Sequence, residues 1–301
     1  MERRKVIITG ASGFVGKNLS AYLQERGYEV EPVSLRSEQW KTKIDPDAFA
    51  VIHLAGLAHD LKNANNPEDY MRVNAELTAA LYDVYVESRI EKFIFFSSVK
   101  AVADRLGAQV LDETHLADPQ TPYGKSKLKA EEYLLGNLRS GKTVYIIRPC
   151  MIHGPGNKGN LNLLYKMIEK GIPYPFAAFE NLRSFLSIEN LNFGVTELLL
   201  QPIASGVYNF ADDVPIPTTE VIDIIYQGLG RKNKMLKISK RLIQILAKLG
   251  DKLPIPFDSE RLKKLTESYV VSNRKITSAM GKSFPVSTQQ GLLRTVKSFK
   301  Q

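Results

Sequence analysis

Tyr123 and Lys127 are the first residues whose types and spacing could do chemistry together. They stand four positions apart at the start of a predicted helix, which puts both side chains on one face. A nearby ammonium favours the phenolate, so a tyrosine with an ordinary pKa of about 10 can exchange protons near neutral pH. Ser97 and Ser98 follow the apolar run Phe93–Phe96, and their side chains face opposite sides of the predicted strand. The pattern indicates an acid–base site with a tyrosine as its central group.

Three glycines, Gly10, Gly13 and Gly16, follow the apolar run Lys5–Thr9 and open a predicted helix. Glycine permits a tight turn, close approach of the backbone to a pyrophosphate, and tight packing of the helix on a sheet. The helix N-terminus adds unpaired N–H donors and the positive end of a dipole. A glycine-rich turn that binds nothing is the alternative, but the position at the first strand–helix junction favours a dinucleotide cradle.

The choice between NAD and NADP depends on the end of the second predicted strand. Enzymes that prefer NAD usually place an acid there to bind the ribose 2′-hydroxyl, whereas a nearby arginine suits the 2′-phosphate of NADP. Ser34 occupies the position expected for the acid, and Arg36 follows two residues later. NADP(H) is therefore favoured. NAD(H) stays possible, because Arg36 could be an ordinary loop residue and Glu31 or Glu38 could supply the acid.

These residues need a scaffold in which strands and helices alternate. Apolar runs of strand length, separated by stretches of helical periodicity, fill the first half of the chain. This alternation predicts an α/β fold, a Rossmann-type doubly wound parallel sheet. The expected strands are Lys5–Thr9, Tyr28–Val33, Val51–Leu54, Phe93–Phe96 and Thr143–Ile147, and the expected helices are Phe14–Arg26, Pro67–Arg89 and Pro122–Arg139.

The sequence changes character after Pro149, where proline-broken loops, shorter helices and isolated strands follow. We therefore expect an NAD(P)-binding domain over residues 1–150 and a smaller C-terminal α/β substrate-binding domain over residues 151–301. Some of the later strands are expected to return to the main sheet.

The chain has 301 residues, a net charge of +9 and a single cysteine, Cys150. A lone cysteine excludes an intrachain disulfide and fits a reducing compartment, here the cytoplasm. The histidines lack zinc-ligand spacing, so no metal site is predicted. No leader precedes the first strand, and no apolar run approaches the roughly 20 residues that span a bilayer. Residues 231–301 hold 17 Lys and Arg against 4 Asp and Glu, which suits an acidic substrate, a nucleic acid or an anionic membrane surface.

The segment Thr9–Gly16, which reads Thr-Gly-Ala-Ser-Gly-Phe-Val-Gly, resembles the extended short-chain dehydrogenase/reductase family of nucleotide-sugar epimerases, dehydratases and reductases. Ser98 precedes Tyr123 by 25 residues, which is similar to the spacing in that family. Further matching segments are Val51–Gly56, Val73-Asn74, Arg148-Pro149, Arg183–Leu191 and Gly291–Thr295, so the resemblance covers nearly the whole chain.

The resemblance implies a role for each matching position. Ser98 would hydrogen-bond the substrate oxygen, Tyr123 would be the general acid/base, and Lys127 would tune Tyr123 and hold the nicotinamide ribose. The implied cofactor-binding residues are Gly10, Ser12, Gly13, Phe14, Val15, Gly16, Ser34, Arg36, Leu54, Ala55, Gly56, Asn74, Tyr123, Lys127 and Pro149. The implied substrate-binding residues are Lys100, Asn160, Phe176 and Arg183. Arg183 would contact the substrate diphosphate, because arginine binds phosphate through two parallel hydrogen bonds. Lys100 could lie near the same diphosphate or face solvent.

The residues after Ser98 restrict the reaction. By resemblance, 4,6-dehydratases carry Thr-Asp-Glu here, decarboxylases carry a Glu, and dual 3,5-epimerase/4-reductases carry a Cys two residues after the Ser. The present chain has Ser98-Val99-Lys100. Hydride transfer at C4 of a nucleotide-diphosphate sugar remains, either by a reductase that consumes NADPH or by a 4-epimerase that retains NAD.

Ser97–Lys100 and Gly154–Asn160 resemble bacterial 4-reductases of UDP-4-keto-6-deoxy-N-acetylhexosamines, which make sugars for surface polysaccharides. The sequence therefore favours a reductase of a UDP-linked sugar, with the UDP-sugar 4-epimerase as the alternative. A non-catalytic dinucleotide-sensing regulator is the alternative from another class, although such proteins usually lose the Tyr or the Lys.

Residues 239–253 begin with a basic amphipathic stretch in which Leu242, Leu246 and Leu249 share one face. The stretch could rest on an anionic membrane. A helix packed over the substrate cleft, with its lysines extended into solvent, is the favoured interpretation. Nucleic-acid binding is disfavoured, since the region lacks interleaved aromatic residues and a recognised motif. By resemblance alone, the helices over 67–89 and 122–139 are expected to pair in a homodimer.

Overall fold

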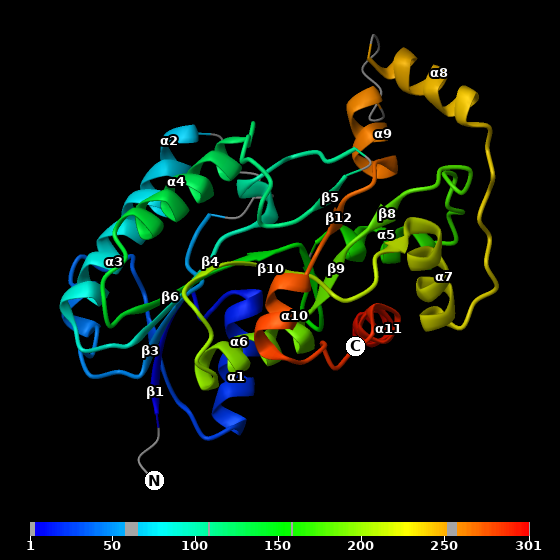
Figure 1. The fold of residues 1–301 in the computed structure, drawn as a ribbon. Coiled ribbons are helices and arrows are strands. Elements are labelled where there is room, and N and C mark those ends of the chain that lie inside the picture. Colours follow the sequence, from blue (N-terminus) through cyan, green and yellow to red (C-terminus); the bar gives the residue numbers. More distant parts are fainter. Residues whose placement is uncertain (1–3, 58–65, 108, 158, 252–257, 301) are drawn as a thin grey trace.

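The computed structural model describes residues 4–57, 66–107, 109–157, 159–251 and 258–300. A six-stranded parallel sheet with the order β10-β6-β4-β3-β1-β2 lies at its centre (Figure 1). Its strands are β1 Lys5–Thr9, β2 Glu29–Val33, β3 Ala50–His53, β4 Lys92–Phe96, β6 Thr143–Pro149 and β10 Gly206–Phe210. The predicted doubly wound fold is confirmed. The first predicted strand coincides with β1, and the other four differ from the structure by one or two residues at their ends.

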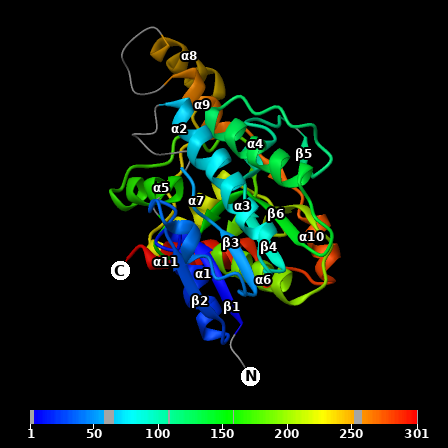
Figure 2. The ribbon, with the colours of Figure 1, turned by 90° about the vertical axis from the view of Figure 1, so that its left-hand side faces the viewer.

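Helices cover both faces of the sheet (Figures 1 and 2). The helices on one face are α1 Phe14–Glu25 and α6 Ile188–Leu200, and those on the other are α3 Leu77–Glu87 and α4 Pro122–Gly136. Within β1, Val6 and Ile8 belong to the core under the first pair of helices, and Ile7 belongs to the core under the second. Because each strand is buried on both faces, the strands read as continuous apolar runs.

The predicted helix Pro67–Arg89 consists of three segments in series. These are α2 Pro67–Tyr70, the π-helical turn η2 Met71–Glu76, and α3. Asn66 caps the start, because its Oδ1 accepts a hydrogen bond from the backbone N of Glu68 at 3.1 Å. A π-helical turn contains one extra residue, so it changes which neighbours the following side chains meet. The buried Asn74 lies within this turn.

The chain after residue 150 builds a second core and also completes the sheet. β10 pairs with β6 in parallel, and α6 packs on α1. The second core lies among α5 Asn160–Glu169, α7 Thr218–Leu229 and α11 Thr288–Ser298. Three two-stranded pairs lie outside the main sheet, and the third joins the two parts of the chain: β7 Met151–His153 with β9 Phe185–Ser187, β8 Leu182–Arg183 with β11 Ile216–Pro217, and β5 Val110–Leu111 with β12 Val270–Val271. Three short helices elsewhere in the chain are η1 Trp40–Lys43, η3 Val99–Ala101 and α10 Arg274–Met280.

Two helices, α8 Lys240–Gly250 and α9 Ser259–Thr266, pack on each other at one end of the molecule (Figure 1). Ile243 and Ala247 of α8 meet Leu262 of α9 in a small apolar cluster. Residues 252 and 253 of the basic stretch lie outside the described residues. Across the described ranges, no helix is both long enough and apolar enough to cross a membrane.

Candidate active site

The loop between β1 and α1 and the first turn of that helix each have one position that only glycine can occupy without rearrangement. Gly10 has a φ of +74°, and a Cβ there would lie 2.6 Å from the backbone N of Ala55. A Cβ on Gly16 would overlap the carbonyl oxygen of Gly10. Gly13 is the N-cap of α1, with no side-chain cap and no acidic residue in the first turn. This uncapped helix end, with its N–H groups and positive dipole, fits the pyrophosphate of a dinucleotide. The other implied residues of this loop and helix start are Ser12, Phe14 and Val15.

A buried chain of hydrogen bonds fixes this loop to the end of β3. Thr9 Oγ1 lies 2.6 Å from His53 Nδ1 and accepts a hydrogen bond from the backbone N of Ala55 at 3.3 Å. The second ring nitrogen of His53 lies 2.9 Å from Thr78 Oγ1. Burial lowers the pKa of His53 to about 3, so the imidazole is neutral and has a positioning role.

Asn74 joins the loop after β3 to helix α4. Its Oδ1 accepts a hydrogen bond from Leu57 N at 2.7 Å, and its Nδ2 donates to Leu57 O at 3.2 Å and Ser126 Oγ at 3.1 Å. A Cβ on Gly56 would lie 2.8 Å from Asn74 Oδ1 and 3.3 Å from Lys127 Nζ. The loop therefore adjoins the lysine of the predicted acid–base site. The other implied cofactor residues of this loop are Leu54 and Ala55.

Two adjacent serines follow β4 and make different contacts. Ser98 lines the cavity that Tyr123 also lines, and its Oγ accepts a hydrogen bond from Lys100 N at 3.1 Å as the N-cap of η3. Ser97 is buried and donates to the carboxylate of Glu131. The alternation of side chains along the strand therefore directs Ser98 to the cavity and Ser97 to the core.

Tyr123 is the second residue of α4, and the helix approaches the chain after Ser98 closely. A Cβ on Gly124 would overlap the carbonyl oxygen of Lys100. The Tyr123 ring meets the ring of Tyr70 edge to face, with centroids 6.2 Å apart. The absence of a side chain at Gly124 therefore lets α4 lie beside η3, where Tyr123 and Ser98 share one cavity.

Asp104 fixes the start of α4. Its Oδ2 accepts hydrogen bonds from the backbone N of Gln120 at 2.8 Å and of Thr121 at 3.1 Å. Thr121 Oγ1 in turn accepts a hydrogen bond from the backbone N of Gly124 at 3.2 Å, as the N-cap. These contacts set where the helix begins, and hence where its first turn places Tyr123.

Lys127 lies one turn after Tyr123 and is buried. Its Nζ donates to the carbonyl of Phe96 at 2.9 Å and lies 4.8 Å from the centre of the Phe95 ring. Burial lowers the pKa of Lys127 to about 8, and the carboxylate of Glu131 opposes this shift by favouring the ammonium. The charged form is therefore present at neutral pH and is lost as the pH rises above about 8.

A buried ion pair that the sequence patterns did not predict lies next to Lys127. Arg148 Nε lies 3.0 and 3.1 Å from the two carboxylate oxygens of Glu131, and Ser97 donates to the same carboxylate. Glu131 follows Lys127 by four residues on α4, and this spacing is a signal that could have indicated its role. Its pairing with Arg148 depends on β6 lying beside β4, which local spacing does not show.

A cavity of about 1010 Å³ opens at the ends of β4 and β6 and the start of α4. Residues from both predicted domains line it, including the loop before α5, β8, and the chain from α9 to Tyr269. The implied site residues that the cavity brings together are Ser98, Lys100, Tyr123, Pro149 and Arg183.

Two cationic residues of this cavity come from distant parts of the sequence. Lys100 Nζ donates to the carbonyl of Asp104 at 2.7 Å and lies 4.1 Å from the centre of the Tyr269 ring. Burial lowers the pKa of Lys100 to about 8, and burial also lowers the pKa of the Arg183 guanidinium. Both groups suit an anionic part of a substrate. Tyr269, whose hydroxyl donates to Ala103 O at 2.7 Å, had no signal in the sequence pattern.

Two implied substrate-binding residues, Phe176 and Asn160, are not among the described side chains that line this cavity. Phe176 packs against Tyr174 and Phe179, with ring centroids 5.5 and 6.4 Å away, and it does not line the cavity. Asn160 is the first residue of α5, and its side chain lies outside the described part of the structure.

Ser34 and Arg36 are both exposed after the end of β2. Glu31 lies within the strand, where its carboxylate is 3.8 Å from Lys5 Nζ. Glu38 is exposed, two residues beyond Arg36. The end of β2 therefore presents a hydroxyl and a guanidinium, a pair that fits the 2′-phosphate of NADP.

Cys150 follows Pro149 in the lining of the cavity and is buried. Burial raises the pKa of its thiol well above the ordinary value. Within the described ranges, no group of three or more His, Cys, Asp and Glu side chains could hold a metal ion.

The sheet topology and the loop after β1 define a dinucleotide-binding protein of the doubly wound class. The chain belongs to the NAD dependent epimerase/dehydratase family, whose model matches residues 6–210. The resemblance inferred from the motifs is thereby confirmed.

Individual relatives include both epimerases and a reductase. The UDP-glucose 4-epimerase of Vibrio cholerae is 28% identical over 324 aligned positions, which cover 99% of this chain and 96% of that protein. The UDP-2-acetamido-2,6-beta-L-arabino-hexul-4-ose reductase of Pseudomonas aeruginosa is 35% identical over 163 positions, which cover 52% of this chain and 38% of that protein. The solved structure of RMD from Pseudomonas aeruginosa complexed with NADPH has a TM-score of 0.77 at 20% identity, and covers 99% of this chain and 100% of that chain.

Proposed function

We propose that the protein is an NAD(P)-dependent oxidoreductase acting at C4 of a UDP-linked sugar. Its proposed reaction is the reduction of a UDP-4-keto-6-deoxy-N-acetylhexosamine for a surface polysaccharide. The observation that carries this proposal is that Ser98 and Tyr123 line one cavity, with the Lys127 ammonium one turn along the same helix. A hydroxyl donor, a phenol and an ammonium are the groups that proton transfer to a carbonyl oxygen requires.

Tyr123 is the proton donor in the proposed reduction. The sugar's C4 keto oxygen accepts hydrogen bonds from the Ser98 and Tyr123 hydroxyls, which polarise the carbonyl. The Gly10–Gly16 loop would hold a nicotinamide dinucleotide, which would supply the hydride that C4 needs. Tyr123 gives its phenolic proton to the oxygen as C4 becomes an alcohol carbon, and the ammonium of Lys127 stabilises the phenolate that remains.

The surroundings of Ser98 support reduction rather than elimination of water. Elimination needs a further acid and base beside the substrate, and the two residues that follow Ser98 are Val99 and Lys100. The nearby carboxylate of Asp104 accepts hydrogen bonds from two backbone N–H groups at the start of α4. That carboxylate is therefore already engaged in positioning the helix.

Different observations support a reductase and a 4-epimerase. The reductase is supported by the exposed Ser34 and Arg36 after β2, and by 35% identity over about half of the chain to a named 4-ketohexosamine reductase. The UDP-sugar 4-epimerase is supported by 28% identity over nearly the whole chain to a UDP-glucose 4-epimerase. The two activities use the cofactor differently, because an epimerase regenerates its NAD within each turnover and a reductase consumes NADPH.

Cofactor consumption distinguishes a reductase from a 4-epimerase and from a non-catalytic regulator. The purified chain, given NADPH and a UDP-4-keto-6-deoxy-N-acetylhexosamine, is expected to oxidise NADPH in equimolar amounts with the sugar it reduces. Co-purified NAD, together with interconversion of UDP-glucose and UDP-galactose without net NADPH loss, would contradict the reductase and support the epimerase. Dinucleotide binding without turnover of either sugar would instead support a sensing regulator.

The preference for NADP is tested at the end of β2. Arg36→Gln is expected to weaken NADPH binding by about tenfold, because it removes a charged hydrogen-bonding partner of the 2′-phosphate, and to leave NADH binding unchanged. Arg139→Gln removes another exposed arginine and serves as the matched control. Equal weakening of NADH and NADPH binding by Arg36→Gln would contradict the assignment.

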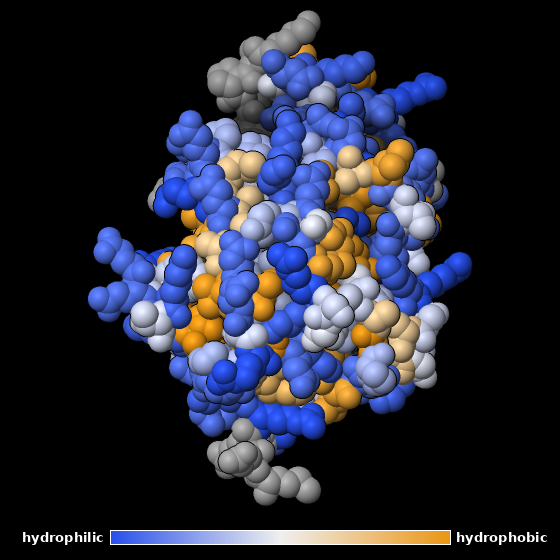
Figure 3. Space-filling view, turned by 60° about the vertical axis from the view of Figure 1, so that its left-hand side comes forward, coloured by the Kyte–Doolittle hydropathy of each residue, from blue (hydrophilic) through white to orange (hydrophobic). Residues whose placement is uncertain are grey.

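We also propose that the protein is a homodimer formed through α3 and α4, which lie side by side on one face of the sheet (Figure 2). Figure 3, which brings the left-hand side of Figure 1 forward, shows apolar residues among charged ones. Leu135 and Leu138, at and just after the end of α4, are 41% and 45% exposed. Leu135→Glu/Leu138→Glu is expected to give a monomer in sedimentation, and Leu163→Glu/Leu200→Glu on exposed leucines elsewhere is the control.

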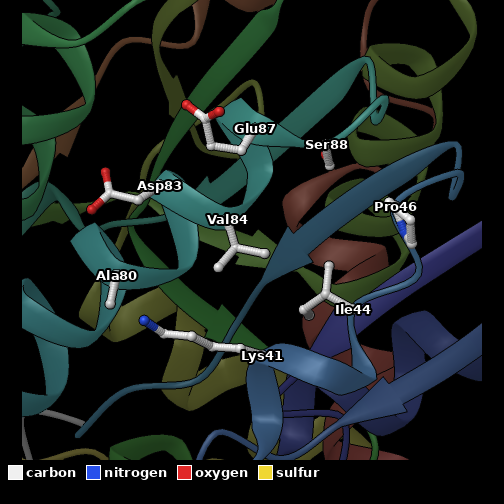
Figure 4. A pocket seen from close by; sticks show the side chains of 8 residues that line it. All are labelled: Lys41, Ile44, Pro46, Ala80, Asp83, Val84, Glu87 and Ser88. Atoms are coloured by element: carbon white, nitrogen blue, oxygen red, sulfur yellow. The ribbon is translucent and has the colours of Figure 1, made fainter.

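A depression of about 370 Å³ also lies beside α3, lined by α3 side chains and by residues 41–46 (Figure 4). It shares no lining residue with the cavity of Ser98 and Tyr123. We therefore assign it no part in the reaction.

In the proposed domain organisation, residues 1–150 bind the dinucleotide and residues 151–301 bind the sugar nucleotide. The exceptions are α6 and β10, which complete the main sheet.

The cytoplasm is the proposed compartment, supported by the single cysteine and by the use of a nicotinamide cofactor.

A further inference from the structure

Helix α8 presents an apolar face to solvent. The side that packs against the protein carries Ile243 and Ala247, which are buried and pack with Leu262 and with the partly buried ring of Phe179. Four large apolar side chains on the neighbouring side are each about half exposed: Leu242 at 50%, Ile245 at 56%, Leu246 at 50% and Leu249 at 47%. The face formed by these four side chains is thus turned outward rather than packed over the cavity.

The chain that leads into α8 and forms it is strongly basic, and Asp251, directly after the helix, is the first acidic residue that follows. Between Arg231 and Gly250 there are seven Lys and Arg residues and no Asp or Glu. At about 100° per residue along a helix, Arg241 and Lys248 fall on one side of α8, next to Leu242 and Leu249 of the apolar face. All seven cationic residues are exposed: Arg231, Lys232, Lys234, Lys237, Lys240, Arg241 and Lys248.

We propose that α8 docks the protein on an anionic membrane surface. The apolar face would enter the region between lipid head groups and acyl chains, and Arg241 and Lys248 would contact lipid phosphates. An apolar face bordered by cations is the arrangement by which interfacial helices bind anionic bilayers. A second copy of this chain fits less well, because its own basic α8 region would be repelled by this one.

The position of α8 in the fold suits such contact. The helix lies at one end of the molecule, away from the central sheet (Figures 1 and 2). It packs on α9, and Glu260 of α9 lines the cavity together with Glu267 and Tyr269. Docking through α8 would therefore bring the cavity near the membrane. If the proposed function holds, this placement suits a sugar product that a membrane-bound transfer reaction consumes.

Vesicle sedimentation of the full-length protein tests the docking surface. We expect binding to phosphatidylcholine vesicles that contain about one-third phosphatidylglycerol to be at least about tenfold stronger than binding to pure phosphatidylcholine, and to weaken as salt is added. Leu242→Gln/Leu246→Gln and Arg241→Gln/Lys248→Gln are each expected to lower the partition coefficient by about tenfold or more.

Two matched control variants replace the same kinds of exposed side chain elsewhere on the surface. Leu163→Gln/Leu200→Gln changes two other exposed leucines, and Lys297→Gln/Lys300→Gln removes two other exposed cations. Both controls are expected to bind anionic vesicles like the unchanged protein. Thermal unfolding of every variant shows whether the fold is intact, and vesicle binding needs no turnover, so failure of the proposed reaction would leave this test valid.

Three results would overturn the proposal. The first is that the unchanged protein does not bind anionic vesicles. The second is that the α8 variants lose no more binding than their controls. The third is that Leu242→Gln/Leu246→Gln changes the sedimentation of the protein in the absence of lipid, with no effect on vesicle binding, which would assign the face to contact between copies of the chain.

Discussion

The cavity has a floor and a cap that are built in different ways. The floor is formed by the ends of β4 and β6, residues 99–103 including η3, and the start of α4. Backbone contacts hold its polar groups: Lys100 N donates to Ser98 Oγ, and Lys127 donates to a carbonyl of β4. The cap is formed by β8, α9 and Tyr269, and its side chains cross to the floor, as the Tyr269 hydroxyl does to the carbonyl of Ala103. In the proposed reaction, secondary structure therefore positions the catalytic groups, and long-range side-chain contacts position the groups that bind the substrate.

The largest expected effect is on the floor. Tyr123→Phe is expected to lower kcat by at least about 10²-fold, because it removes the proposed proton donor, and to leave dinucleotide affinity largely intact. Tyr133→Phe, on the same helix, removes a hydroxyl that bonds Asp83 at the surface and is the control. Steady-state kinetics and cofactor titration measure both quantities. Near-normal turnover in Tyr123→Phe would remove this residue from the mechanism.

A smaller effect is expected from moving the floor without changing its chemistry. Gly124→Ala adds a Cβ that would overlap the Lys100 carbonyl oxygen, so α4 must shift. We expect kcat to fall roughly 10- to 100-fold and the free energy of unfolding to fall by about 1–3 kcal/mol. A Cβ on Gly136, in the same helix, meets nothing within 4 Å, so Gly136→Ala should keep full activity. Unchanged kinetics in Gly124→Ala would show that close helix contact is not needed.

A substitution in the cap is expected to weaken substrate binding rather than to slow turnover. Arg183→Lys keeps the charge but loses the two parallel N–H groups, and it is expected to raise KM about tenfold with kcat nearly unchanged. Arg294→Lys, at an exposed position near Glu189, is the control. A loss of kcat as large as that of Tyr123→Phe would show that the division between floor and cap is wrong.

The smallest expected effect is a change in pH dependence. The Glu131 carboxylate favours the ammonium of Lys127, whose pKa burial lowers to about 8. Glu131→Gln removes that favourable charge and leaves the buried Arg148 without its carboxylate, which also destabilises the fold. In the folded variant the pKa of Lys127 should fall further, and the alkaline limb of kcat should move to lower pH by up to about one unit. Glu132→Gln, at the exposed neighbouring position, should leave the profile in place. An alkaline limb that stays at the same pH in both variants would show that Glu131 does not influence the acid–base site.

Most of the floor could be predicted from local sequence patterns. Continuous apolar runs such as Phe93–Phe96 mark strands buried on both faces, and the spacing of Tyr123 and Lys127 within one helix requires only the helical period. Gly10 has a positive φ, and the backbone of Gly10 lies close to Gly16, so both positions require glycine. This requirement explains why the sequence predicts a dinucleotide-binding loop after β1. Each of these signals lies within a few residues of the feature that it predicts.

The features that could not be predicted depend on contacts between distant residues or on small departures from regular geometry. Tyr269 reaches the floor because β12 pairs with β5, far away in the sequence. The π-helical turn around Asn74 adds one residue to a helix whose apolar period changes little over so short a stretch. α8 has apolar residues on two adjacent sides, so its pattern alone does not show which side packs.

The burial of Cys150 makes the unchanged protein a convenient background for site-specific labelling. It is the chain's single cysteine, and burial raises the pKa of its thiol, whereas alkylating reagents attack thiolates. A cysteine introduced at the exposed Gln244 of α8 would therefore be the thiol that reacts first. A fluorophore or spin probe attached there could report the depth of the helix at a lipid surface while the native cysteine stays in place.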